Sequence, residues 1–337
     1  MDFITYDDTI IFSHDFNKKL DPELLSNYKK IIFSDFELDD NLFEAYENNN
    51  FNNLKWINSK FNQSLNNSLD NLTSLKHLTF GHYFNKPLNN SLDNLTSLTY
   101  LTFGIQFNQP LNNSLDNLLF LTHLTFGSNY NQPLANSLRS LTSLTHLTFG
   151  YYFNQPLTNS LDNLTSLTNL TFGKSFNQSL DNSLDKLIYL THLTFGHYFN
   201  QPLDNSLDHL TSLNYLTLGY HFNQNNDLPT NIKSITIDCK NYYYTDFLPS
   251  SIEEIELGYN FNLGLDNLPS SIKKISFKKK SNYNKELNCL PNGLEILKLN
   301  YKYTRQIKNI PSGLKKIIYS KDYSFINDFT GIEIETY

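Results

Sequence analysis

The stretch from Leu144 to Leu164 reads LTHLTFGYYFNQPLTNSLDNL, and it recurs with few changes along the middle of the chain. Its inner aromatic residue, the one directly before Asn, returns every 23 residues over seven steps. These positions are Phe61, Phe84, Phe107, Tyr130, Phe153, Phe176, Phe199 and Phe222. Self-similarity at such a period marks an array of units that bury their apolar faces on one another.

The length of the unit selects among repeat architectures. A helical-hairpin repeat needs about 34 residues and a propeller blade about 40, so a 23-residue unit is too short for either. It has room for one short strand, a turn and a short return path, which is the size class of leucine-rich-repeat coils.

One coil can be interpreted residue by residue. In the copy from Leu98 to Leu118, Leu101 and Phe103 alternate with polar neighbours, which predicts a short strand. Gly104 ends the strand, and we expect it to supply a backbone angle that other residues reach only at a cost. Pro110 opposes a continuing ladder, and Ser114 is a candidate cap for a short helical turn.

Stacking such coils in register would place equivalent residues in continuous columns. One column holds Leu78, Leu101, Leu124, Leu147, Leu170, Leu193 and Leu216. A second holds Phe80, Phe103, Phe126, Phe149, Phe172, Phe195 and Leu218, beside the inner aromatic series. The sequence therefore predicts a β-rich, right-handed, leucine-rich-repeat-like solenoid with one parallel β-sheet on the concave face and short turns, 3-10 or helical turns, on the convex face.

An Asn follows each buried aromatic, where the chain turns inward. The series is Asn85, Asn108, Asn131, Asn154, Asn177, Asn200 and Asn223. Because Asn carries both donors and acceptors, we expect a structural ladder in which each side chain satisfies its own coil and the next. The alternative is a ladder that binds a ligand or glycan.

The two ends modify the pattern without leaving it. We expect a single solenoid over residues 1–337, with degenerate coils over 1–60, regular coils over 61–224 and shorter coils over 225–337. The first part includes a predicted strand at Leu54–Trp56. In the last part, Leu-Pro or Ile-Pro pairs recur at 20 to 22 residues and favour an extended return path.

Composition excludes several protein classes. The 337 residues carry a formal net charge of −7, two cysteines and no apolar run near the roughly 20 residues of a membrane span. The N-terminus is acidic and lacks the basic region of a signal peptide, so we expect a cytoplasmic protein with reduced thiols. No nucleophile–base motif, phosphate loop or metal-ligand spacing is present, which predicts a non-enzyme without cofactors or metal.

Units of the form Leu-x-x-Leu-x-Phe-Gly-x-x-Phe-Asn-x-Pro-Leu resemble FNIP repeats, relatives of leucine-rich repeats. The later Leu-Pro-Ser-Ser-Ile units are similar to that family's usual form. The resemblance implies a protein of the kind found in social amoebae or their large DNA viruses, hence host cytoplasm if viral. Many such proteins resemble F-box adaptors, whose F-box often opens with a string similar to Leu20-Asp21-Pro22-Glu23-Leu24-Leu25. Here this string lies in phase with the repeat, and the chain around it leaves no room for a three-helix F-box.

Two sets of residues are candidate partner-binding sites. Outward strand positions form one column of rings: His77, Tyr100, His123, His146, His192 and Tyr215. Residues 271–321 hold thirteen Lys or Arg against two Glu, a net of +11, and the group to test is Lys273, Lys274, Lys278, Lys279, Lys280, Lys298, Lys315 and Lys316. Each set also has a structural interpretation. The rings can be ordinary sheet surface, and the lysines can protect the end of the sheet from edge-to-edge aggregation.

Three functions follow from these candidates. The first is a noncatalytic scaffold that binds a protein partner on the sheet or the basic coils. The second is a self-assembling protein whose acidic first 50 residues, with twelve Asp or Glu against four Lys, meet the basic coils. The third, implied by the resemblance, is a substrate receptor for a ubiquitin ligase. We expect neither nucleic acid nor membrane as partner; the weighed enzyme alternative is a glycosidase-like β-helix.

Overall fold

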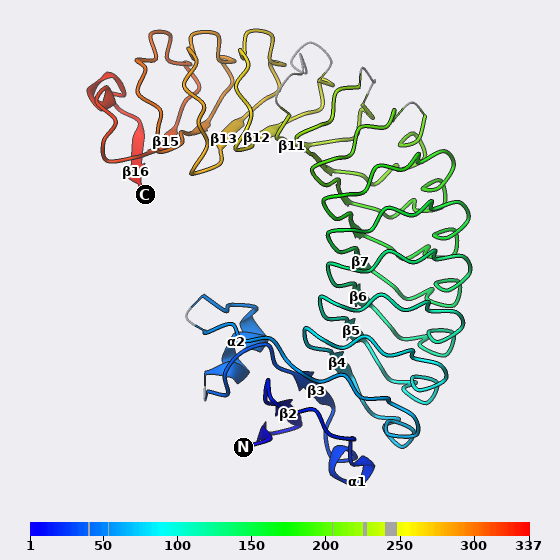
Figure 1. Cartoon of the computed structure of the whole chain (residues 1–337). Helices are drawn as coiled ribbons and strands as arrows, with labels where there is room; N and C mark the ends of the chain where they lie inside the picture. Colours follow the sequence, from blue (N-terminus) through cyan, green and yellow to red (C-terminus); the bar gives the residue numbers. More distant parts are fainter. Residues whose placement is uncertain (40, 53, 204, 225–227, 240–247) are drawn as a thin grey trace. The chain divides into compact units, whose positions relative to one another are not determined.

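The structure is a computed structural model that describes residues 1–39, 41–52, 54–203, 205–224, 228–239 and 248–337. These residues belong to two units, Met1–Leu187 and Ile188–Tyr337. In each unit the strands stack along one side of successive coils and the turns lie on the other side (Figure 1). Each unit is therefore a coil-on-coil solenoid.

The described residues of unit 1 form eight strands whose order follows the chain. They are β1 (Phe3–Tyr6), β2 (Thr9–Phe12), β3 (Lys30–Phe33), β4 (His77–Thr79), β5 (Tyr100–Thr102), β6 (His123–Thr125), β7 (His146–Thr148) and β8 (Asn169–Thr171). The first pair is antiparallel, and every later pair is parallel and in register. Leu101 thus lies opposite both Leu78 and Leu124, which confirms the predicted column.

Two columns of aromatic rings fill the core of unit 1. Phe103 lies 5.8 Å from Phe80 and 5.7 Å from Phe126 along one column, ring centre to ring centre. It also lies 4.0 Å from Phe107 of the inner column, so the two columns interleave. All these rings are buried. Burying each stabilises the fold by about 2–3 kcal/mol, and a coil standing alone would lose most of that.

In the regular coils the glycine that follows the strand is required for close approach of coils, which corrects our explanation from backbone angle. A Cβ on Gly127 would lie 1.8 Å from the carbonyl oxygen of Gly104, and Gly150 stands in the same relation to Gly127 at 1.9 Å. Among the described glycines, only Gly331 has a positive φ. Gly127 and Gly150 therefore admit no side chain because the backbone of the preceding coil occupies the space.

The Asn residues form the expected ladder between coils. The side-chain oxygen of Asn108 accepts hydrogen bonds from the backbone N–H of Asn131 at 2.9 Å and from the Gln132 amide at 3.1 Å. The backbone N–H of Asn108 in turn donates to Asn85. The same bond recurs 23 residues apart from Asn62 to Asn177. These bonds confirm that each Asn side chain serves the next coil, while its service to its own coil stays a prediction.

The outer side of the regular coils consists of turns. The expectation that Ser114 caps a short helical turn is wrong, because no helix forms there. Its hydroxyl instead donates to the carbonyl oxygen of Asn89 in the preceding coil. The left-handed conformation that these turns need falls mostly on Asn, for example Asn112 with φ 47°. Ala135 adopts it in one coil, with φ 42°. Asn tolerates this region better than Ala does.

The segment between β3 and the first regular coil differs from the prediction. We expected a strand at Leu54–Trp56, but β3 pairs directly with β4. The intervening chain instead carries helix α2 (Leu42–Asn48), and Phe36 packs on Phe51 and Trp56. Phe51 and Trp56 thus pack in a side cluster rather than in a strand column.

Helix α1 (Pro22–Leu25) covers the string compared with an F-box. It is a single turn, capped by the Asp21 side chain, on the crossover from β2 to β3. Leu25 is buried in that crossover. The string is therefore part of a coil.

The described residues of unit 2 also form eight strands. They are β9 (His192–Thr194), β10 (Tyr215–Leu218), β11 (Ser234–Ile237), β12 (Glu254–Leu257), β13 (Lys274–Phe277), β14 (Ile296–Lys298), β15 (Lys316–Tyr319) and β16 (Glu333–Thr336). All adjacent pairs are parallel. The change of repeat length, which the sequence places at 224/225, adjoins residues 225–227 outside the described part of the chain.

Candidate functional site

The ring column on the sheet of unit 1 is a continuous stack. The His77 and Tyr100 ring centres lie 4.4 Å apart, those of Tyr100 and His123 4.2 Å apart, and those of His123 and His146 4.2 Å apart. The interplanar angles are 18° or less. In-register strands impose this spacing, because equivalent side chains on neighbouring strands lie about 4.8 Å apart. The rings therefore expose their edges.

Threonines fix the orientation of two of these imidazoles. Thr122 donates its hydroxyl hydrogen to the carbonyl oxygen of Thr99 at 3.0 Å, and the same hydroxyl lies 2.9 Å from Nδ1 of His123. A hydroxyl has one hydrogen, so Nδ1 of His123 must be the donor and Nε2 carries the lone pair. Thr145 holds His146 in the same way. The half-buried rings thus carry hydrogen-bond acceptors at Nε2.

The electrostatics keep this column neutral. Partial burial and nearby Lys30 lower the pKa of His77 to about 4. Burial also lowers the pKa values of His123, where His146 adds to the effect, and of His146 itself. At neutral pH these three imidazoles are therefore uncharged, and the threonines of the same strands, such as Thr102 and Thr125, alternate with buried leucines.

Unit 2 carries a shorter ring stack and a charged face. His192 and Tyr215 stack at 4.2 Å, and Thr191 contacts Nδ1 of His192 at 2.8 Å. On the following strands, Lys274 pairs with Glu254 at 2.9 Å and Lys278 pairs with Glu256 at 2.6 Å. The sequence window of 271–321 missed these partners because they come from earlier coils.

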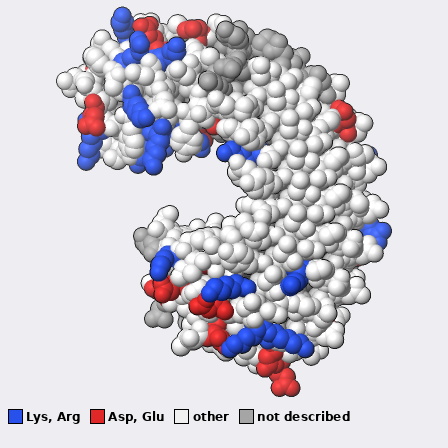
Figure 2. Space-filling model, viewed as in Figure 1, with Lys and Arg blue, Asp and Glu red and all other residues white. Residues whose placement is uncertain are grey.

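Five of the other six lysines of the predicted basic patch contact acidic or aromatic side chains. Three more form ion pairs: Lys273 with Glu253, Lys315 with Glu295, and Lys316 with Glu333 and Glu335. The Lys279 ammonium lies 4.8 Å from the Tyr301 ring and 4.9 Å from that of Tyr337, Lys298 lies over Tyr337, and Lys280 is exposed. Figure 2 shows basic and acidic side chains together over the C-terminal coils. Much of the apparent excess charge is therefore locally compensated.

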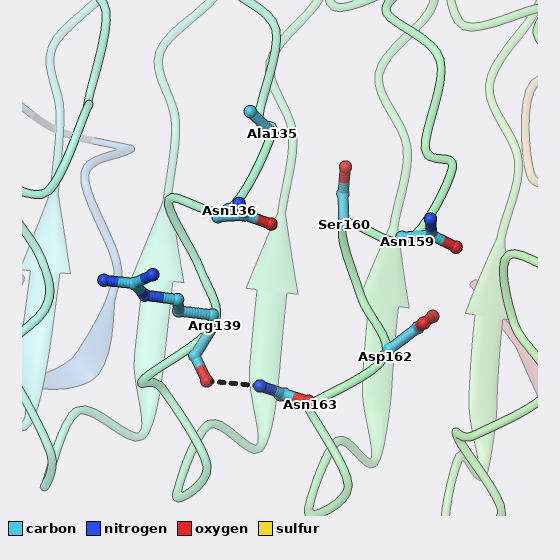
Figure 3. Close-up of a pocket in the computed structure, with 7 residues that line it drawn as sticks. All are labelled: Ala135, Asn136, Arg139, Asn159, Ser160, Asp162 and Asn163. Atoms are coloured by element: carbon cyan, nitrogen blue, oxygen red, sulfur yellow. Dashed lines mark hydrogen bonds between the residues drawn. The ribbon is translucent and has the colours of Figure 1, made fainter.

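The turns of unit 1 enclose two shallow polar cavities. One, of about 260 Å³, is lined by Ala135, Asn136, Arg139, Asn159, Ser160, Asp162 and Asn163 (Figure 3). Asn163 donates to the Arg139 carbonyl at 2.9 Å, and the Arg139 side chain points away from Asp162. The other, of about 390 Å³, is lined by Asn, Ser and Asp side chains. Ligand pockets are mostly apolar, so these resemble gaps between turns.

The described residues include no group of three or more His, Cys, Asp or Glu side chains placed to hold a metal ion. His123 and His146 stack face to face rather than converging on a point. Among the same residues, no helix has the length and apolar character of a membrane span.

Comparison with known families explains the repeat. The FNIP Repeat model matches residues 224–260, 244–280 and 283–322. Residues 224–280 and 283–322 carry FNIP repeats. The matched segments fall in the shorter Leu-Pro coils, whose sequence was expected to be closest to the usual FNIP form. No curated protein matches this chain.

Solved structures similar to this chain include leucine-rich-repeat proteins. The giant-virus protein CroV588, described as a novel circular LRR structure, matches with TM-score 0.69 and 29% identity over 96% of this chain. This chain spans only 48% of CroV588. An internalin of Listeria monocytogenes matches with TM-score 0.54 and 18% identity, over 80% of this chain and 82% of the internalin chain. The LRR protein LIC12759 of Leptospira interrogans matches with TM-score 0.53 and 18% identity, over 95% of this chain and 81% of its own. The last two show the fold alone.

Proposed function

We propose that the protein is a noncatalytic scaffold that binds a protein partner on the sheet face of unit 1. The observation that carries the proposal is the stack of His77, Tyr100, His123 and His146, in which the Tyr100 side chain is 40% exposed. Rigid, partly apolar rings with polar edges are characteristic of interface cores, because they give contact area at little entropic cost.

The hydrogen-bonding pattern specifies the chemistry of the partner. His123 and His146 offer Nε2 acceptors, and the neighbouring threonines offer hydroxyl groups. A matching surface would carry N–H or O–H donors beside apolar side chains, and it would not need a strong charge. The lysines of the predicted basic patch support this role less, because ion pairs occupy five of the eight.

A crosslinking experiment tests the proposal. A photoreactive amino acid at Thr125, on the sheet face, should give discrete protein adducts in extract from cells of the natural host. The same residue at Asn113, in an outer turn, is the control. Replacing Tyr100, His123 and His146 by Asn, the residue that β8 uses at Asn169, should abolish the Thr125 adducts without unfolding the chain. Adducts that survive this triple replacement would overturn the proposal.

A further inference from the structure

The repeats serve as an internal reference for unusual surface residues. Directly before each strand, two outer positions lie between buried leucines, and five of the seven copies place Thr-Ser there: 73–74, 96–97, 142–143, 165–166 and 211–212. The exceptions are Leu119-Phe120 and Ile188-Tyr189. These substitutions are not required by the fold, because the same turn forms with Thr-Ser.

Leu119 and Phe120 expose apolar surface in unit 1. Their side chains are 53% and 63% exposed, while Leu118 and Leu121 on either side are buried. The backbone N–H of Leu121 donates to Leu118 at 3.0 Å, which holds the pair on a tight turn. Two adjacent exposed apolar side chains in an otherwise polar column are a characteristic of a contact site.

A second departure from the repeat lies one coil further on. One position of the outer turns is Asp in most copies, but it is Arg139 in the coil after that of Phe120. Arg139 bonds Asp116 at 2.8 Å. Asp93 occupies the position one coil before, and the side chain of Asn117 donates to its carbonyl oxygen. The apolar pair is thus flanked by acid on one side and base on the other.

Such an arrangement is complementary to itself. Consider a two-fold axis that lies in the interface, passes over the coil of Phe120 and is perpendicular to the direction in which the coils stack. Such an axis reverses the order of the coils in the second copy. Phe120 then faces its equivalent, while Arg139 of each copy faces Asp93 of the other. Two-fold interfaces require this kind of pairing between one patch and its own image.

We propose that two copies of this chain associate through the patch formed by Asp93, Asp116, Leu119, Phe120 and Arg139. The apolar pair forms the centre, and two symmetric Arg139–Asp93 pairs set the register. The Ile188-Tyr189 turn lacks the alternation of charge, since the positions one coil before and one coil after it are Asp162 and Asp208. It is therefore a matched control. The surface is separate from the ring column proposed to bind a partner.

Analytical ultracentrifugation of the full chain from about 1 to about 100 μM tests the proposal. Wild type should sediment as a reversible dimer. Restoring the repeat residues with Leu119→Thr/Phe120→Ser should raise the dissociation constant at least about tenfold, because it removes the central anchor. Ile188→Thr/Tyr189→Ser should leave it unchanged. A wild type that remains monomeric over this range would overturn the proposal.

A charge swap tests the two-fold geometry itself. Arg139→Asp alone should weaken the dimer about tenfold or more, because the new carboxylate would face Asp93 of the other copy. Asp93→Arg alone should weaken it similarly. The double variant Asp93→Arg/Arg139→Asp should recover to within about threefold of wild type. If the two effects simply add, the copies do not pair in this register, and the inference is wrong.

Discussion

The regular coils of unit 1 and the short coils of unit 2 build the same ladder with different surfaces. In unit 1, Gly127 and its equivalents bring successive backbones into contact, and neutral rings stack on the sheet. In unit 2, lysines such as Lys274 pair with glutamates of the preceding strand. The comparison shows that buried columns specify the fold, while the outward positions are free to differ.

The glycine contact of the regular coils should give the largest difference from the short coils of unit 2. Gly127→Ala should destabilise the protein by about 3 kcal/mol or more, because its Cβ would lie 1.8 Å from the Gly104 carbonyl oxygen. Gly293→Ala in unit 2 should cost less than about 1 kcal/mol, because the nearest atom lies 3.3 Å away. Urea unfolding measures both, and equal losses would contradict the close approach.

The Asn ladder gives a second contrast. Asn108→Ala should cost about 1–3 kcal/mol, because it leaves the backbone N–H of Asn131 without its acceptor. In unit 2, Asn284 accepts from the backbone N–H of Thr304 at 3.1 Å on an exposed surface, where water can replace it. Asn284→Ala should cost less than about 1 kcal/mol in the same unfolding assay. A greater loss at Asn284 would reverse this ranking.

Acid should weaken the two units in different pH ranges. The folded state lowers the pKa of His77 to about 4, so folding favours the neutral ring. Stability is then constant above the unfolded pKa of about 6.5 and falls between that value and about 4. After a discount for solvent screening, the loss from His77 should be about 1–2 kcal/mol.

In unit 2 the ion pair with Lys273 lowers the pKa of Glu253, and that with Lys315 lowers the pKa of Glu295. Their contribution is present above the unfolded pKa of Glu and is lost only as pH falls below it. Thermal unfolding from pH 8 to pH 3 separates the two ranges. Replacing His77, His123 and His146 by Asn should remove the loss above pH 4 and leave the more acidic one.

The smallest expected effect is a gain in stability. Ala135 has φ 42°, a region that Asn tolerates better. Ala135→Asn should therefore stabilise unit 1 by about 0.5 kcal/mol, seen as a small rise in Tm. Ser270→Asn, in a turn of unit 2, should change stability by less than this. A loss at position 135 would show that its turn differs from those of the other coils.

Periodicity predicted the strands, the leucine and phenylalanine columns and the Asn ladder, because identical coils repeat identical contacts. It failed at Leu54–Trp56, where apolar spacing imitated a strand but the residues pack on Phe36. It also misjudged the basic patch, since the partners of Lys274 and Lys278 are spaced about one coil away in sequence. The ring stack was predictable as a column, but the tautomer of His123 and of His146 depended on the hydroxyl of the preceding threonine.

The neutral, oriented ring column is the central claim, and NMR of the histidine side-chain nitrogens tests it most directly. We predict that His123 and His146 carry hydrogen on Nδ1, that their pKa values lie below 6.5, and that His77 titrates near 4. Hydrogen on Nε2 together with ordinary pKa values would contradict the claim.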